Sequence, residues 1–218
     1  AIGNESGSID QMNNSVAIGN FCGNVSQSDS CVAIGVNSGQ TGQGWGSVAI
    51  GRGSGQINQR TNSIAIGRDA AQYDQKTWSL ALGIQAGQTS QGEQSTAIGG
   101  LAGAYKQGDN SLAIGRRSGY TSQGAGCLAI GQFSGEYSQG TGSFAVGQYS
   151  GQTSQGDNCF AVGLSSGADN QGNNSFALGQ YSANKNQGID CIAIGQHAAE
   201  INQGKNSIAF GQRSGHIN

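Results

Sequence analysis

The sequence predicts an all-β parallel solenoid in which each 16-residue repeat forms one coil with two strands. Three observations carry this prediction: a period of sixteen with no insertion or deletion, charges confined to certain places in the unit, and 40 glycines without a proline. Repeats too small to bury a face alone stack on their neighbours and form one continuous core. We expect about 13.6 coils in a single domain over residues 1–218.

The repeating unit has several fixed positions. Position 1 is Ser or Cys, as in Ser15, Cys31 and Ser47, and it recurs every sixteen residues. Position 3 is always Ala, position 5 always Gly and position 13 always Gln. Position 4 is Ile, Val, Leu or Phe, and position 2 is the same apart from Thr96. All 10 basic and 12 acidic residues fall at positions 6, 7, 10, 11, 12, 14, 15 or 16.

Two strands and their corners follow from this pattern. Segments such as Ser-Val-Ala-Ile-Gly at positions 1–5 alternate β-forming residues, whereas a helix needs apolar residues three and four apart. Position 11, with Ile9, Val25, Thr41 and Tyr73, indicates a second, more exposed strand. Gly at positions 5, 9 and usually 14 suits corners that need positive φ or close backbone approach. At about 4.8 Å per coil the rod would be roughly 65 Å long.

Stacked coils place identical side chains above one another. At position 13 we predict a structural ladder of glutamine amides that hydrogen-bond along the stack or hold the corner backbone. Its members are Gln11, Gln27, Gln43, Gln59, Gln75, Gln91, Gln107, Gln123, Gln139, Gln155, Gln171, Gln187 and Gln203.

The two faces of the first strand differ in side-chain size, and neither carries a charge. We interpret the large residues at positions 2 and 4 as the coil interior, opposite the small residues at position 8. The Ser/Cys–Ala–Gly face would then lie against a second sheet or against solvent. The inverse assignment, with the Ile/Val/Phe ridge outside, stays open. Either arrangement favours self-association, because a strand free of charge on both faces is typical of burial on both sides.

The five cysteines contain no CxxC pair, which argues against a disulfide framework or a zinc site. Four of them, Cys31, Cys127, Cys159 and Cys191, replace Ser at position 1, and we interpret them as small buried residues. Cys22 could meet Cys31 across one coil, so the state of this pair stays open.

Composition and motifs argue against several other classes. No acid, base or nucleophile recurs in a catalytic arrangement, and His197 and His216 are interpreted as surface residues, so we predict no enzyme, cofactor or metal. The net charge of −2 and the scattered basic residues argue against nucleic acid. No stretch reaches the roughly 18 apolar residues of a membrane helix. Because the chain begins and ends inside a repeat, we interpret it as a mature product or a segment of a longer array.

Exposed aromatic residues are the candidates for recognition, since aromatic platforms stack on sugars or on partner proteins. A purely structural role stays open, because Tyr and Thr are good strand residues. The candidates are Phe133, Tyr149 and Tyr181 at position 7, with Tyr73, Tyr105 and Tyr137 at position 11.

The hexapeptides NSVAIG (14–19), NSIAIG (62–67) and NSLAIG (110–115) resemble the head repeats of trimeric autotransporter adhesins. Similar Ala-Ile-Gly repeats occur in viral and phage fibre proteins, and the QGxNSxA run is more loosely similar to curli-type filament repeats. The resemblance covers all 218 residues at the level of the repeat, although the adhesin unit is usually shorter than sixteen. It implies a left-handed parallel β-roll with a fibrous, surface-exposed role.

We therefore predict a non-catalytic structural or adhesive rod, or a self-assembling fibre or filament subunit, located outside the cell or on a cell or virion surface. The expected partners are further copies of the chain, as a trimer or a lateral or end-to-end filament, and a glycan or cell-surface receptor. Nucleic acid and membrane insertion are not expected. The alternative is an ice-binding protein with a flat, regular β-face, although Thr occupies position 11 in only four of fourteen coils.

Overall fold

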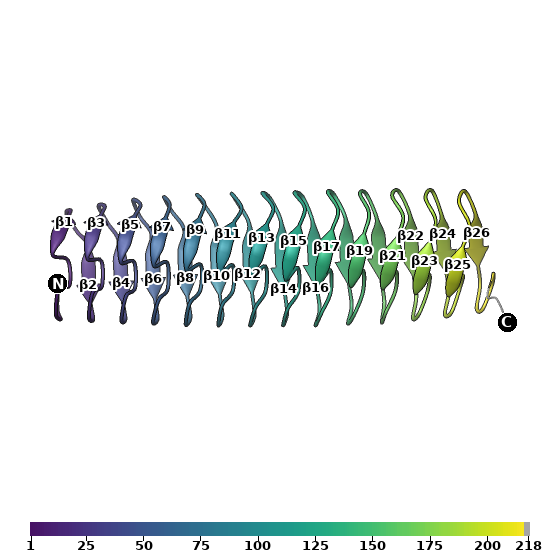
Figure 1. Ribbon diagram of the computed structural model, residues 1–218, viewed down its shortest axis with the longest axis horizontal. Coiled ribbons are helices and arrows are strands. Elements are labelled where there is room, and N and C mark those ends of the chain that lie inside the picture. The colour runs from purple at the N-terminus through teal and green to yellow at the C-terminus, as the bar shows by residue number, and fades with distance from the viewer. Residues whose placement is uncertain (216–218) are drawn as a thin grey trace. The chain divides into compact units, whose positions relative to one another are not determined.

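The computed structural model describes residues 1–215. These residues form a parallel β-solenoid with two three-residue strands in each 16-residue turn, 26 strands in all, and no helix (Figure 1). The predicted fold class is confirmed. No helix able to cross a membrane occurs in this described part of the chain. The chain divides into two compact units, Ala1–Asn110 and Ser111–Asn218.

In the first unit the strands alternate between two parallel sheets, which we call the glutamine sheet (positions 11–13) and the alanine sheet (positions 2–4). The glutamine sheet contains β1 (Ile9–Gln11), β3 (Val25–Gln27), β5 (Thr41–Gln43), β7 (Ile57–Gln59), β9 (Tyr73–Gln75), β11 (Thr89–Gln91) and β13 (Tyr105–Gln107). The alanine sheet contains β2 (Val16–Ile18), β4 (Val32–Ile34), β6 (Val48–Ile50), β8 (Ile64–Ile66), β10 (Leu80–Leu82) and β12 (Thr96–Ile98).

The second unit repeats this arrangement. Its alanine sheet contains β14 (Leu112–Ile114), β16 (Leu128–Ile130), β18 (Phe144–Val146), β20 (Phe160–Val162), β22 (Phe176–Leu178), β24 (Ile192–Ile194) and β26 (Ile208–Phe210). Its glutamine sheet contains β15 (Thr121–Gln123), β17 (Tyr137–Gln139), β19 (Thr153–Gln155), β21 (Asp169–Gln171), β23 (Lys185–Gln187) and β25 (Ile201–Gln203).

Each strand residue pairs with the residue sixteen positions along the chain, so the strand register follows the sequence period. In the alanine sheet Ala33 pairs with Ala49, sixteen residues along, and both flanking positions pair in the same way. In the glutamine sheet only positions 11 and 13 pair, because position 12 is left-handed, as at Asn58 with φ 57°. An inserted residue would move every later side chain to the opposite face, and this explains the constant repeat length.

Corners depend on left-handed residues at several positions. Positions 7, 12 and 16 have positive φ with side chains that include Asn, Ser and aromatic rings. The Gly column at position 5 has a further reason. A Cβ on Gly51 would lie 2.7 Å from the Gly67 oxygen of the next coil, so stacking itself excludes a side chain there.

The coil interior corrects the sequence-based assignment of the strand faces. The small side chains point inward: position 3 Ala, position 1 Ser or Cys, position 8 Ser or Ala, and the position 13 amide are buried. The large residues at positions 2 and 4 lie on the outer face, as Ile64 does at 38% exposure. The prediction that they fill the interior was therefore wrong, and so was the prediction that the Ser/Cys–Ala–Gly face lies outside. A 16-residue coil encloses too little space for two walls of branched side chains.

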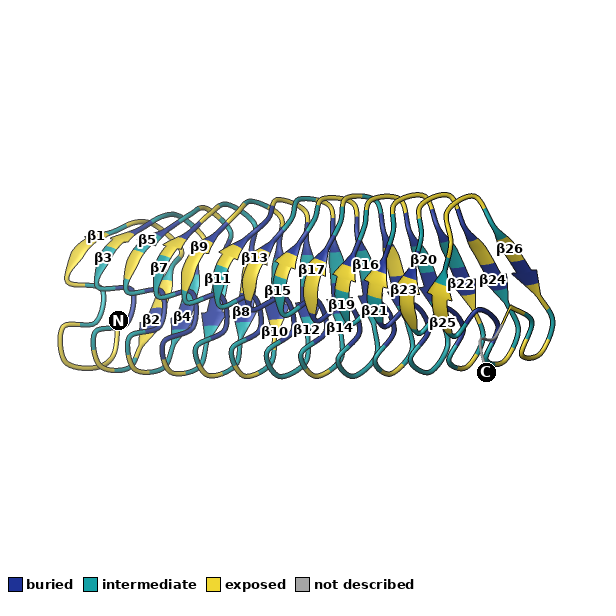
Figure 2. Cartoon of the chain, turned by 45° about the vertical axis from the view of Figure 1, so that its right-hand side comes forward, coloured by how far each residue is buried: buried dark blue, intermediate teal, exposed yellow. Residues whose placement is uncertain are grey.

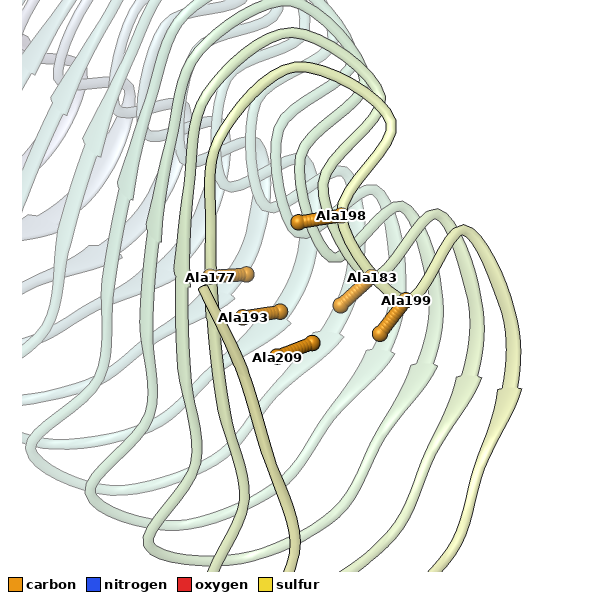
Figure 3. Close-up of a cluster of buried hydrophobic side chains, with 6 residues drawn as sticks. All are labelled: Ala177, Ala183, Ala193, Ala198, Ala199 and Ala209. Carbon is orange, nitrogen blue, oxygen red and sulfur yellow. The ribbon is translucent and has the colours of Figure 1, made fainter. Parts of the chain in front are cut away.

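Figure 3 shows this interior in the second unit, where Ala177, Ala193 and Ala209 of the alanine sheet point toward alanines of the opposite corner. Methyl groups in register pack without voids along such a column. Figure 2 shows the same alternation of buried and less buried residues along the coils. Among residues 1–215 the buried hydrophobic side chains are therefore all Ala or Cys, and the larger apolar side chains lie at the surface.

Candidate functional site

The outer face of the alanine sheet is an uncharged surface of aliphatic and aromatic side chains. In the first unit it consists of Val16, Ile18, Val32, Ile34, Val48, Ile50, Ile64, Ile66, Leu80, Leu82, Thr96 and Ile98. In the second unit it consists of Leu112, Ile114, Leu128, Ile130, Phe144, Val146, Phe160, Val162, Phe176, Leu178, Ile192, Ile194, Ile208 and Phe210. None of these residues is buried. We call this surface the apolar face.

Parallel pairing without offset keeps the apolar face regular. Identical positions stand above one another, and the rings of Phe160 and Phe176 stack with centroids 4.5 Å apart and planes at 1°. If each side chain leaves about 50 Å² accessible, one unit offers about 600 Å², the size of the largest apolar patch on a typical monomer. A patch of this size is often functional.

Behind this face, the position 13 glutamines fill the interior with amides. Gln59 is fully buried, and its Nε2 donates to Val48 O at 2.8 Å, Ser63 O at 3.2 Å and Gln75 Oε1 at 3.1 Å. The amides therefore bond both to the backbone and to one another, which stiffens the wall that carries the apolar face.

The amide bonds form an unbroken series in the first unit and separate pairs in the second. The series runs from Gln27 through Gln43, Gln59 and Gln75 to Gln91. The pairs are Gln123–Gln139, Gln155–Gln171 and Gln187–Gln203. At the first coil Gln11 donates to Ser15 O, and Gln107 donates to Thr96 O.

A second amide series lies at position 10, where sequence reasoning expected none. Gln56 donates to Gln40 at 2.9 Å, Gln72 to Gln56 at 2.9 Å and Gln88 to Gln72 at 3.2 Å. These side chains are half-buried. Four consecutive glutamines at one unit position were the signal in the sequence.

Hydroxyl and thiol groups at positions 1 and 8 satisfy the remaining carbonyls of the interior. Ser38 Oγ donates to Ala49 O at 2.7 Å, and Ser143 Oγ donates to Gly156 O at 2.6 Å. Cys159 Sγ contacts Gly172 O at 3.0 Å in the same place as that serine. The position 1 cysteines thus act as serine substitutes.

All five cysteines are buried and free, so Cys22 and Cys31 are not bonded. Burial raises the thiol pKa of Cys22, Cys31, Cys127 and Cys159 above the ordinary value, which keeps these thiols protonated. A protonated, buried thiol is a poor nucleophile and a poor metal ligand. Among residues 1–215 no group of three His, Cys, Asp or Glu side chains is placed to hold a metal ion.

The six aromatic candidates fall into different surroundings. Phe133 and Tyr149 stack at 5.2 Å with planes 5° apart, and Tyr181 stacks on His197, also at 5.2 Å. Tyr73 and Tyr105 are exposed in the first unit, each paired through the backbone with Thr89 of the strand between them. His216 lies outside the described residues.

Tyr137, the sixth candidate, belongs to a cluster around Arg117. Arg117 Nη2 lies 2.9 Å from Glu136 Oε1 and 2.8 Å from the Tyr137 hydroxyl. Its guanidinium lies 4.4 Å from the centroid of Tyr120 and 5.7 Å from that of Phe133, within cation–π range. Glu136 is only 3% exposed, so the pair is largely shielded from solvent. We call these five residues the arginine cluster.

Sequence reasoning missed the arginine cluster because three of its members, Phe133, Glu136 and Tyr137, lie 16 to 20 residues from Arg117 and meet it through stacking of adjacent coils. The signal was a glutamate at position 10, one coil after an arginine at position 7. The Arg117 guanidinium contacts the rings of Tyr120, Phe133 and Tyr137.

The remaining titratable contacts are ordinary surface pairs. His197 Nδ1 lies 2.9 Å from Glu200 Oε2, and Lys76 Nζ lies 3.0 Å from Asp109 Oδ1.

Comparison with known families gives one match. Residues 90–118 match the family model described as the YadA head domain repeat, in two copies. No curated protein matches the chain. The match includes the segment NSLAIG at 110–115, one of the three hexapeptides that carry the resemblance, so this stretch has the YadA-type head repeat that the sequence predicted.

Proposed function

We propose that this chain is a non-catalytic structural and adhesive module, exposed at a cell surface, that works as an assembly of several copies in which residues 1–218 act as one rod-like domain. The apolar face is the observation that carries the proposal. The YadA-type head repeat supports it, because such heads belong to trimeric autotransporter adhesins.

A second copy of the chain is the occupant that suits the apolar face best. The face repeats every sixteen residues, so two or three copies in register would present identical rows to one another. It carries no charge, so covering it buries no unpaired ion. Two faces of about 600 Å² each bury about 1,200 Å², within the range of specific protein interfaces.

The other surfaces of the coil would mediate adhesion. The arginine cluster and the stacked pair of Phe133 and Tyr149 stand at positions 7, 10 and 11, away from positions 2 and 4. Assembly through the apolar face leaves them accessible. We propose that they contact a receptor or a glycan on a target surface.

Sedimentation equilibrium tests the assembly. The wild-type chain, 22.0 kDa as a single copy, is expected to sediment as a multiple of that mass. Leu128→Lys combined with Phe160→Lys places two charges on the apolar face and should reduce the mass to one copy. The matched control, Thr121→Lys with Thr153→Lys, uses position 11 of the glutamine sheet, where Lys185 occurs naturally. A wild-type chain that stays a single copy at micromolar concentration would refute the proposal.

A further inference from the structure

A polar hollow lies on the corner of the first unit between the glutamine sheet and the alanine sheet. It measures about 410 Å³ and is lined by Gly42, Gly44, Asn58, Gln59, Arg60, Thr61 and Thr77. That volume falls at the small end of ligand pockets, which occupy roughly 300–1,000 Å³. Gly42, the one glycine in the position 12 column, leaves its part of the lining without a side chain.

Two tryptophans directly follow residues of the hollow in the sequence. Trp45 follows Gly44 and is 53% exposed, and Trp78 follows Thr77 and is 56% exposed. Backbone bonds tie both to the lining coil: Asn62 N donates to Trp45 O, and Trp78 N donates to Thr61 O. The chain contains only these two tryptophans.

Trp78 also occupies an unfavourable backbone position. Its φ is 56°, a left-handed conformation that is uncommon for a bulky side chain. The other residues at position 16 are Asn, Ser, Gly, Gln and Asp, which adopt this conformation more readily. The exposed indole of Trp78 gains no stability from core packing that would offset the cost of this backbone conformation. We therefore expect the indole to contact a molecule outside the chain.

The charge of the hollow comes from Arg60. The ion pairs of the described residues involve other arginines and Lys76, and Arg60 has no carboxylate partner among residues 1–215. Asp74 accepts a bond from Asn58 Nδ2 at 2.9 Å but does not line the hollow. An exposed guanidinium beside amide and hydroxyl groups suits a carboxylate that is flanked by hydroxyls.

We infer that this corner is a binding site for a carboxylate-bearing oligosaccharide. Arg60 would pair with the carboxylate, Asn58, Thr61 and Thr77 would bond sugar hydroxyls, and the indoles would pack on sugar rings. The inference deepens the adhesive part of the proposed function and rests on it. It uses residues remote in sequence from the arginine cluster.

Isothermal titration with an oligogalacturonate hexamer tests the site, with the methyl-esterified hexamer as a probe of equal length without charge. We expect binding of the acidic hexamer and at least about tenfold weaker binding of the ester, the effect of losing a charge-assisted pair. Arg60→Gln should weaken binding of the acidic hexamer to the same degree. Arg52→Gln, an exposed arginine at position 6, is the matched control and should bind as wild type.

Two variants separate recognition from folding. Trp78→Asn installs the commonest residue of its column and should lose binding at least about tenfold without a lower denaturation midpoint. Gly42→Ser fills the hollow, and its Cβ would lie 3.4 Å from Asn58 Oδ1, an ordinary contact. No binding of the acidic hexamer at millimolar concentration, or equal binding by these variants, would overturn the inference. Preferential binding of single-stranded DNA would also overturn it, whereas self-association measured by sedimentation would be unaffected.

Discussion

Replacing Gln75 with methionine tests whether the interior amides hold the coils together. Gln75 is fully buried, and its side-chain amide has four polar contacts, three of them sharing the two protons of Nε2. Its Nε2 donates to Ile64 O at 2.9 Å, Ser79 O at 3.2 Å and Gln91 Oε1 at 3.1 Å, while its Oε1 accepts from Gln59 at 3.1 Å. Methionine has similar length and no hydrogen-bonding amide, so Gln91 Oε1 loses its donor inside the coil.

The expected loss follows from these contacts. The two amide protons and the one accepted bond make about three bonds at about 1 kcal/mol each; one buried acceptor left unpaired adds about 1–3 kcal/mol, and burying an apolar side chain returns about 1 kcal/mol, so the net loss is about 4 kcal/mol. Gln72→Met is the matched control, because Gln72 belongs to the half-buried surface series, and its cost should stay below about 1 kcal/mol. Urea denaturation followed by circular dichroism measures both free energies of unfolding. A cost below about 1 kcal/mol for Gln75→Met would refute a structural role for the amides.

Three further changes probe the corners, the arginine cluster and the buried thiols. Gly67→Ala should cost about 3 kcal/mol or more in urea denaturation, because its Cβ would lie 2.4 Å from a carbonyl oxygen of the next coil. Gly126→Asn, with φ 66° and no atom within 4 Å, should stay within about 0.5 kcal/mol of wild type, and equal costs would contradict the stacking argument. Arg117→Gln should destabilise by about 2 kcal/mol because it removes the cation from the buried Glu136 carboxylate and leaves it the Gln152 amide, whereas Glu136→Gln should cost less than half as much. Burial raises the folded-state pKa of the Cys159 thiol, so its contribution to stability is complete below the ordinary thiol pKa of 9.0 and is lost as pH rises further. Cys159→Ser should therefore flatten the fall of the melting temperature between pH 8 and pH 10, and an unchanged slope would contradict this reasoning.

Much of the fold could be predicted from the sequence because stacking converts sequence period directly into register. The two strands of each coil could be recognised from short segments that begin with a β-branched residue, such as Val48–Ile50 and Thr41–Gln43. Constant spacing then determines which residues pair, as Val48 with Ile64. The left-handed backbone at positions 12 and 16 was not predicted, although Asn, Ser, Asp and Gly dominate both columns.

Hydrophobicity could not predict which face of the alanine sheet points into the coil and which points outward. Ile64 and Ala65 are neighbours on one strand, and the usual expectation places isoleucine inside and alanine on either side. The reverse holds because the coil is short and its two walls lie close together. The uncharged columns of small residues marked the interior, and the uncharged columns of large residues marked a surface for contact.

The candidate sites depend on contacts between side chains of successive coils. The repeat period alone does not show which of these contacts form a site. Arg117 and Glu136 meet because positions 7 and 10 adjoin in successive coils. The hollow beside Arg60 is lined by residues of three successive coils, from Gly42 to Thr77. Such features become visible only when the coils are placed on one another.

Cysteine accessibility tests the central claim, that small residues line the coil while the apolar face is covered by further copies. In a chain whose five native cysteines are serine, Ile192→Cys and Ala193→Cys would place single thiols on opposite faces of β24. Maleimide labelling of the native protein should leave Cys at 193 unreacted at every concentration. It should modify Cys at 192 in dilute solution and progressively less as the protein concentration rises. Rapid labelling at 193, or labelling at 192 that does not change with concentration, would contradict this account.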